Sequence, residues 1–350
     1  MIKQNIFNMS KIGFLVVVVL FVGMFSSCDS KDGKSKQGML FTSGGRPSEV
    51  LVVMPKQNWK MTVGDTIRNT LGETPLWMAQ NEPEYRLSQI EKSQFGKIFQ
   101  KFRNILIVEF DESLTKTKIT VQQNVHARPQ TIVKIQSPNL NSFLTAYTHT
   151  YKQIKTYYHK NELSRISEAY KKMEVKKISK KMREKYSFKM VLPEGFFIAV
   201  DKKDFMWLRR PTREVEEGIL IYSYPYTDTS DFNYHRIITL RDSLTKIYIP
   251  GPVDGSYMKV SSFFPPVHNT LKFKGNYATE IRSLWDVHGY AMGGPFMSYS
   301  FVDTIAGRMI MIDGFVKAPR KPKRDLMLRI EAMLTSFEFI NSGDAKLNEE

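Results

Sequence analysis

Cysteine is almost absent from this sequence: its 350 residues include only one, Cys28. A single thiol excludes an internal disulfide, a zinc site built from several cysteines and a paired-cysteine redox centre. The main uncharged apolar stretch, Ile12–Phe25, is shorter than the roughly 20 residues that a membrane-spanning helix needs. Apolar residues make up 42% of the chain and charged residues 25%, which excludes wholly disordered and collagen-like proteins.

Motifs that carry known chemistry are also lacking. The sequence contains no GxSxG nucleophile elbow, no phosphate-binding loop and no GxGxxG fingerprint. The histidines show no metal-binding spacing; they are His126, His149, His159, His235, His268 and His288. We therefore predict no catalytic residues, no metal site and no cofactor from the sequence.

The N-terminus has the pattern of a secretory signal peptide. Lys3 and Lys11 precede the apolar stretch Ile12–Phe25, and small residues follow it. The segment Phe25-Ser26-Ser27-Cys28 resembles the lipobox of bacterial lipoproteins, although Phe25 stands where that motif usually has leucine. The resemblance implies that the Cys28 thiol carries a diacylglyceryl group and that the chain is cut just before it.

A lipidated Cys28 implies a cell-envelope protein that is bound to the membrane through its N-terminal lipid anchor. We expect the protein to face the periplasm, and the sequence leaves inner and outer membrane open. Residues 29–45 are rich in Gly, Ser and Lys, which is typical of a flexible tether between lipid and folded domain.

The predicted fold class is α+β, with two α/β sandwich-type domains of mostly antiparallel sheets joined by a long basic helical segment. Expected strands include 49–54, 104–110 and the hairpin 119–135; expected helices include 59–71 and 94–102. Glycines in Met292-Gly293-Gly294-Pro295 predict a tight hairpin turn there. The predicted divisions are a signal peptide at 1–27, a tether at 28–45, an N-terminal domain at 46–138, the helical segment at 139–186, a C-terminal domain at 187–341 and a disordered tail at 342–350.

Positive charge exceeds negative charge, with 51 Lys and Arg against 35 Asp and Glu, and much of the excess lies in the helical segment. An apolar stripe at helical spacing should pack on the N-terminal sheet; it comprises Phe143, Tyr147, Tyr151, Ile154 and Tyr158. Six lysines should project outward: Lys171, Lys172, Lys176, Lys177, Lys180 and Lys181. Anionic lipid headgroups or acidic envelope polymers are the expected counter-charges, nucleic acid is not expected in the envelope, and a merely solvated helix face is the alternative.

Several stretches resemble a family of bacterial envelope lipoproteins known as domain of unknown function 4837. They are 44–53 (GGRPSEVLVV), 102–108 (FRNILIV), 292–298 (MGGPFMS) and 313–319 (DGFVKAP). The likeness is expected to cover nearly all of the mature chain, and it implies no assigned activity. The opening 187–193 (SFKMVLP) and the closing Ser336-Phe337-Glu338 are also similar to the Mog1/PsbP-like sandwich, which implies a non-catalytic binding fold for the C-terminal domain.

The expected function is non-enzymatic binding or scaffolding, including a possible protein partner. Tyr222, Tyr224 and Tyr226 alternate along a predicted strand and so share one face. Together with Trp207, Trp285 and Tyr290 these aromatic residues either stack on a sugar or peptide or pack in the core. The acidic neighbours Glu214, Glu216 and Glu217 are interpreted as a charged turn.

An envelope hydrolase is the alternative function. Its best candidates are His235 or His288 acting with Asp286 or Asp313, chosen for side-chain chemistry alone.

Overall fold

The computed structural model describes residues 40–78 and 80–340. Cys28, the predicted signal peptide and the predicted C-terminal tail lie outside the described residues. The chain divides into the units Met1–Leu40 and Phe41–Glu350, and the folded elements below belong to the second unit. Within the described part of the chain, no helix combines the length and the hydropathy that crossing a bilayer requires.

The N-terminal sheet has five strands in the order β3-β2-β4-β7-β5. Its strands are β2 (Glu49–Val53), β3 (Arg86–Ile90), β4 (Asn104–Phe110), β5 (Lys118–Gln123) and β7 (Thr131–Ser137). The first four strands in this order pair in parallel, and only β5 runs antiparallel, to β7. Near-continuous apolar runs such as 50–53 suit this arrangement, because a parallel sheet is buried on both faces.

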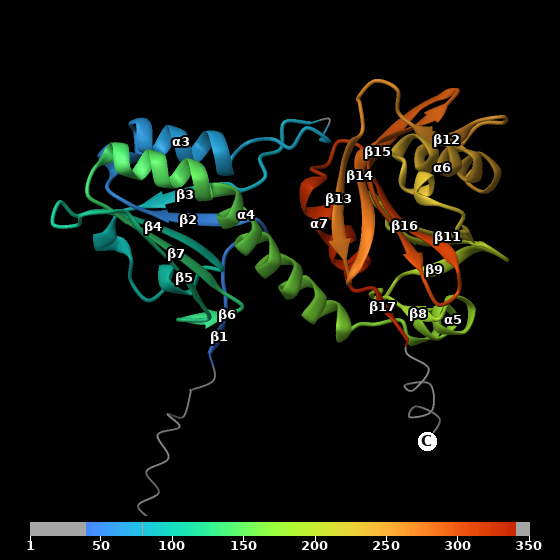
Figure 1. Cartoon of the computed structure of the whole chain (residues 1–350), viewed down its shortest axis with the longest axis horizontal. Coiled ribbons are helices and arrows are strands. Elements are labelled where there is room, and N and C mark those ends of the chain that lie inside the picture. Colours follow the sequence, from blue (N-terminus) through green and yellow to red (C-terminus); the bar gives the residue numbers. More distant parts are fainter. Residues whose placement is uncertain (1–39, 79, 341–350) are drawn as a thin grey trace, which may run out of the picture. The chain divides into compact units, whose positions relative to one another are not determined.

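Helices cover one face of this sheet and short turns cover the other (Figure 1). The helical face carries α3 (Thr62–Leu71) and α4 (Leu140–Lys171), with α2 (Lys56–Trp59) just before α3. The opposite face is covered by the 3-10 turns η1 (Lys92–Gln94) and η2 (Phe99–Lys101). The predicted helix over 94–102 is therefore wrong: Phe95, Phe99 and Phe102 have helical spacing, but they reach the sheet from two separate turns on either side of Gly96.

The predicted helical segment consists of two helices with different cores. The stripe on α4 is buried on the N-terminal sheet as predicted, with Tyr151 partly buried. The second helix, α5 (Lys176–Tyr186), instead places Ile178, Met182 and Tyr186 in the C-terminal core. A short parallel bridge between β1 (Phe41–Thr42) and β6 (Ala127–Arg128) completes the N-terminal half.

The C-terminal half is built on an eight-stranded antiparallel sheet in the order β12-β14-β15-β16-β11-β10-β9, with β13 also paired to β14. Its strands are β9 (Phe197–Lys202), β10 (Phe205–Pro211), β11 (Glu216–Pro225), β12 (Tyr257–Val260), β13 (Val267–Phe273), β14 (Asn276–His288), β15 (Tyr290–Asp303) and β16 (Arg308–Lys317). A small pair, β8 (Phe188–Lys189) with β17 (Glu338–Phe339), closes the chain end.

Helices pack on both faces of the large sheet (Figure 1). Helix α6 (Tyr234–Tyr248), preceded by η3 (Thr229–Phe232), covers the face that holds Leu220 and Tyr222. Helix α7 (Arg324–Leu334) covers the opposite face with Ile219 and Ile221, because neighbouring strand residues point to opposite sides. The α+β class with mostly antiparallel sheets is confirmed, and the parallel N-terminal sheet is the exception within it.

Candidate binding cleft

An apolar hollow lies at one end of β14 and β15, and the Met292–Pro295 motif forms part of its lining. It encloses about 360 Å³. We call it the Trp285 cleft. Its walls come from β14 and β15, the β12–β13 loop, the loop after α3 and the residue before α7, and they comprise Met78, Gln80, Glu82, Ser261, Phe263, Phe264, Leu284, Trp285, Asp286, Met292, Gly293, Gly294, Pro295 and Lys323.

The Met292–Pro295 motif forms part of this wall and is not the predicted turn. Gly289, with a φ of 79°, makes the turn between β14 and β15 instead. A Cβ on Gly294 would lie 2.0 Å from the carbonyl oxygen of Val316, so only glycine fits between these backbones. That close approach lets the buried Trp285 indole donate its Nε1–H to the same carbonyl at 3.3 Å. The glycines thus hold Trp285 in place.

Two exposed phenylalanines border the cleft. Phe263 is 83% exposed and Phe264 is 44% exposed, both on the loop that joins β12 to β13. Pro265 and Pro266 follow them, and proline lacks the N–H that a strand needs for pairing. The loop therefore holds two large apolar side chains in solvent beside the cleft, where folding alone gains nothing from them.

Charged groups surround the apolar floor. Asp286 lies 3.2 Å from the Lys259 ammonium. On another side, Lys323 donates its side-chain N–H to Gln80 at 3.0 Å, and burial lowers its pKa although Glu82 acts in the opposite direction. The cleft therefore offers an apolar base with charges of both signs at its edge.

Glu82 ties the loop after α3 to the start of α7. Its carboxylate accepts the backbone N–H of Lys323 at 2.7 Å and that of Arg324 at 2.9 Å. Since Lys323 supplies no side-chain cap to α7, the distant carboxylate takes the role of the N-cap. A second contact with α7 is the ion pair between Arg86 of β3 and Asp325, whose nitrogen and oxygen lie 3.1 Å apart.

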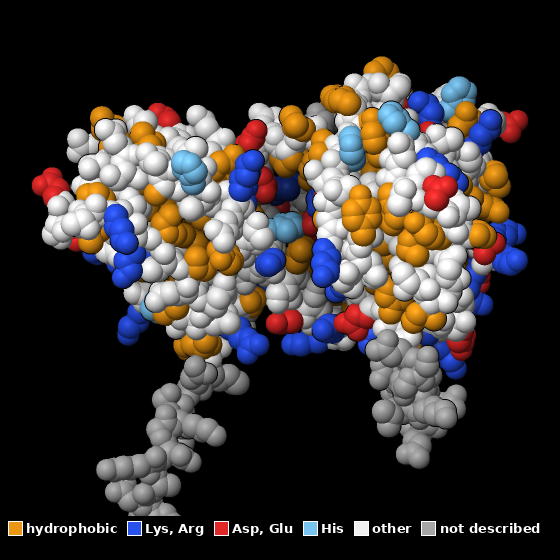
Figure 2. Space-filling view, in the orientation of Figure 1, with side chains coloured by type: hydrophobic (Ala, Val, Ile, Leu, Met, Phe, Trp, Pro, Cys, Tyr) orange, Lys and Arg blue, Asp and Glu red, His pale blue; other side chains and the backbone are white. Residues whose placement is uncertain are grey.

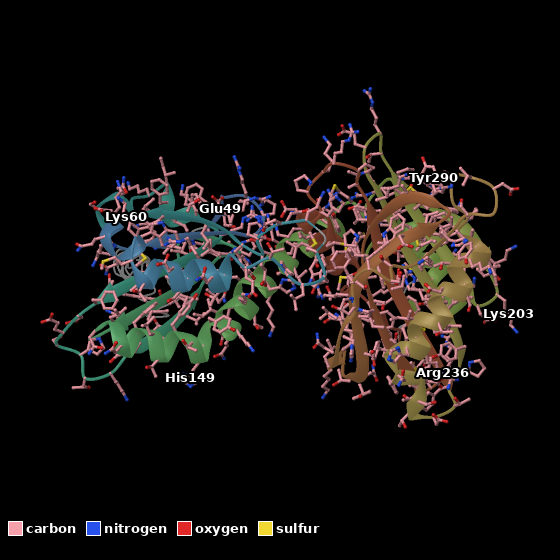
Figure 3. All side chains as sticks on the ribbon, turned by 90° about the horizontal axis from the view of Figure 1, so that it is seen from above. Glu49, Lys60, His149, Lys203, Arg236 and Tyr290 are labelled. Carbon is pink, nitrogen blue, oxygen red and sulfur yellow. The ribbon has the colours of Figure 1, made fainter. Side chains whose placement is uncertain are left out.

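The aromatic residues singled out in the sequence do not form one exposed platform. Tyr222, Trp207 and Trp285 are buried in the core beneath α6, as the packing interpretation predicted. Tyr224 is half-buried against the same core. Tyr290 is 46% exposed and lies near the outer end of β15 (Figure 3).

The hydrolase candidates are held in other contacts. His288 stacks on Tyr257 with ring centroids 5.0 Å apart, and Asp286 is paired with Lys259. His235 contacts the Tyr234 ring at a centroid distance of 3.9 Å.

The fourth candidate, Asp313, is fully buried and accepts from Arg241 Nε at 2.8 Å. Burial raises the pKa of Asp313, against the opposing effect of Arg241. Among the described residues, no group of three or more metal-binding side chains comes together.

The histidine that does meet a carboxylate is His159, which sequence reasoning missed. Its Nε2 lies 2.8 Å from Glu331 Oε1, and Arg282 donates to the same carboxylate at 2.8 Å. Burial acts to lower the pKa of His159, but the charge and hydrogen bond of Glu331 outweigh it and the pKa is raised. His159 and Glu331 are 172 residues apart, and no local motif marks the pair. It joins α4 to α7.

The six predicted lysines are all exposed, as expected. They lie at the end of α4 and along α5, opposite the buried side chains Ile178 and Met182. Lysine and arginine side chains are visible below the end of α4 in Figure 2.

Comparisons with known families divide the chain at the junction of α4 and α5. Residues 43–171 match the family described as domain of unknown function DUF8532. Residues 175–336 match the family described as domain of unknown function DUF4837, which confirms the predicted resemblance there. The expected extent was too wide, because 44–53 and 102–108 fall in the DUF8532 match, on a separate sheet with its own core.

No curated protein matches the chain. The Saccharomyces cerevisiae Ran-binding protein Mog1p is 12% identical, covers 45% of this chain and 92% of its own, and has a TM-score of 0.32. A Bacteroides thetaiotaomicron protein is 9% identical over 45% of this chain and 46% of its own, with a TM-score of 0.27. The two family matches therefore lie one after the other, with residues 43–171 similar to the DUF8532 family and residues 175–336 similar to the DUF4837 family.

Proposed function

We propose that this protein is a lipid-anchored protein of the bacterial cell envelope that binds an apolar segment of a partner protein in the Trp285 cleft. The observation that carries the binding role is the exposure of Phe263 and Phe264 beside an apolar hollow. Exposed apolar groups next to a concave apolar surface are typical of binding sites.

The size of the cleft favours side chains of a partner over a large free ligand. Its volume of about 360 Å³ is near the lower end of the range for ligand pockets, enough for a few apolar side chains. A bound segment would also cover the solvent-exposed surface of Phe263 and Phe264, which line the cleft. The charged groups at the edge suit the polar rim of a protein interface: Asp286 pairs with Lys259, and Lys323 donates to Gln80.

The lipid anchor rests on the resemblance around Cys28. One acyl chain holds a protein only marginally, at about 0.8 kcal/mol per buried CH₂, whereas several chains on one cysteine give stable anchoring. Such an anchor confines the cleft to the membrane vicinity, so the expected partner is an envelope protein. The test is metabolic labelling with a fatty acid. Label on the wild type and none on Cys28→Ala is expected; label on the variant would contradict the anchor.

The cleft is tested by photo-crosslinking in cells of the native host. A photoreactive phenylalanine analogue at position 263 should give one discrete protein adduct under ultraviolet light. The matched control places the analogue at Ile305, which is 88% exposed on the turn between β15 and β16. Adducts at both positions alike, or at neither, would overturn the proposed interface.

A further inference from the structure

We propose that a basic face on α4 and α5 lies against an anionic lipid leaflet and sets the orientation of the anchored protein. The basic face consists of Lys171, Lys172, Lys176, Lys177, Lys180 and Lys181. This inference deepens the proposed lipid anchoring and rests on it for the location of the protein at a membrane.

The helical geometry gathers these charges on one side. On α5, lysines at positions 176, 177, 180 and 181 lie on the arc opposite Ile178 and Met182, which are buried in the C-terminal core. Burial of the apolar arc fixes which way the helix faces, so the lysines have no alternative to solvent. Lys202 at the end of β9 and Lys203 in the turn after it extend the face, and Lys203 lies at the outer edge of the domain (Figure 3).

The acidic residues nearby neutralise only part of this charge. Asp201 lies 3.2 Å from Lys181, and Glu184 lies 3.9 Å from Lys180. In the described part of the chain, Lys171, Lys172, Lys176 and Lys177 form no ion pair. A face of unpaired lysines attracts an anionic surface over about a Debye length of 8–10 Å.

The start of the folded chain is held close to this face. Arg165 of α4 donates from Nη2 to the backbone carbonyl of Ser43 at 2.6 Å, and its other terminal nitrogen donates to the Ser43 hydroxyl. At a rise of 1.5 Å per residue, Lys171 lies roughly 9 Å further along α4. The attachment point of the predicted tether is thus fixed near the basic face.

The predicted tether is short enough for the lipid at Cys28 and the basic face to reach the same membrane surface together. If the segment from Cys28 to Phe41, where β1 begins, behaves as a flexible linker, its ends are on average roughly 20 Å apart. A lipid at Cys28 would then keep Phe41 within about two Debye lengths of the bilayer. Because the anchor already supplies attachment, the lysines act on orientation.

The expected partner of the basic face is an anionic lipid surface, and the alternative partner is an acidic envelope polymer. The experiment uses the chain that begins at Asp29, which contains every described residue but no lipid site, so a failure of anchoring cannot affect it. Sedimentation is measured with neutral phosphatidylcholine vesicles and with vesicles containing anionic phosphatidylglycerol, at low and high salt. Strong binding is expected only to anionic vesicles at low salt.

The test variant is Lys171→Gln/Lys172→Gln/Lys176→Gln/Lys177→Gln. Each lysine near a leaflet strengthens binding roughly fivefold, so the variant should bind at least tenfold more weakly. The matched control changes the same net charge on the N-terminal domain, at the exposed Lys60, Lys97, Lys116 and Lys118, and should keep most of the binding. Equal loss in both variants would mean that only net charge matters, and would overturn the proposal.

Binding to polyglutamate, measured at the same concentration of negative charge as in the anionic vesicles, distinguishes an acidic polymer from a lipid surface as the partner. Binding to the polymer without binding to anionic vesicles would overturn the proposal in favour of an acidic polymer. Circular dichroism melts of both variants establish that the exposed substitutions leave the fold intact.

Discussion

The two halves of the molecule treat buried polar groups differently. In the N-terminal half, Arg103, Asn104, Asn161 and Glu162 are buried together and bonded to one another. In the C-terminal half, polar atoms are also buried, but many have no partner. Among the described residues, every buried side-chain nitrogen or oxygen that lacks a hydrogen bond belongs to Tyr170 or a later residue.

Several of the unpaired atoms of the C-terminal half lie on the sheet face beneath α6. Ser283, Ser298 and Ser300 point there from β14 and β15, with Tyr222 from β11 and Arg241 Nη1 from α6. A polar group buried without a partner is unfavourable unless water satisfies it. The comparison teaches that the N-terminal core satisfies its buried polar groups with its own side chains, whereas the C-terminal layer buries polar atoms that have no protein partner.

The largest expected effect comes from opening the closed network. Glu162→Ala removes the carboxylate that accepts from Arg103 at 2.9 Å and from Asn104 at 2.8 Å. Arg103 would stay buried with its charge unpaired, which costs about 3–5 kcal/mol of unfolding free energy. Urea unfolding of the chain that begins at Asp29 measures this loss of unfolding free energy. A loss below about 1 kcal/mol would contradict the closed hydrogen-bond network.

A pair of double variants sharpens the comparison. Replacing Arg241 and Asp313 by Met and Leu removes both members of a buried ion pair, and such replacements are often neutral or stabilising. We expect a change within about 1 kcal/mol. The same replacement at Arg103 and Glu162 should cost clearly more, because Asn104 loses a bonded acceptor. If the two double variants lose the same unfolding free energy, the two halves do not differ in how they treat buried polar groups.

A smaller effect separates a paired from an unpaired hydroxyl. Ser137 and Ser300 are both fully buried. Ser137 donates to the carbonyl of Asn139 at 3.1 Å and contacts the Thr117 hydroxyl at 2.7 Å, whereas the Ser300 hydroxyl has no protein partner. Ser137→Ala should therefore cost about 1 kcal/mol, and Ser300→Ala should be neutral or slightly stabilising. If Ser300→Ala costs as much, an ordered water satisfies that hydroxyl.

Much of the fold was predictable because apolar periodicity reflects burial directly. The α4 stripe and the strands 49–53 and 104–110 were found where the structure has them. Strands β9 and β13 are not predicted because their sequences, FIAVDK and VHNTLKF, do not alternate strictly between apolar and polar residues, and most of their residues are exposed or only partly buried. Local pattern cannot identify a strand that gains most of its stability from backbone pairing.

The candidate site was less predictable. The sequence predicts a turn at 292–295, but the structure requires glycine there because backbone carbonyls of neighbouring strands approach closely, that of Trp285 at Gly293 and that of Val316 at Gly294. The sequence shows where the glycines are, but it does not show which neighbouring backbone atom leaves no room for a side chain there. For the same reason, contacts such as Glu82 with the start of α7 leave no signal in the local sequence.

The pair that links the two halves gives the smallest expected effect, and it depends on pH. His159 of α4 faces Glu331 of α7, with Arg282 of β14 on the other side of the carboxylate and Glu84 also nearby. The pKa of His159 is raised in the folded protein, so protonated His159 stabilises the fold. This contribution is complete below about pH 6.5, the ordinary histidine pKa, and is lost as pH rises through the higher folded value.

Glu331 behaves in the opposite sense. Burial acts to raise its pKa, but Arg282 and His159 outweigh burial and the pKa is lowered, so its contribution is present above the ordinary carboxyl range and is lost in acid. Both contributions coexist between about pH 4.5 and 6.5. Urea midpoints should therefore fall between pH 6 and pH 8.5 in the wild type and fall less in His159→Gln. His149→Gln, on an exposed part of the same helix, is the matched control and should follow the wild type. A His159→Gln variant with the wild-type pH dependence would mean that the pair does not couple the two halves.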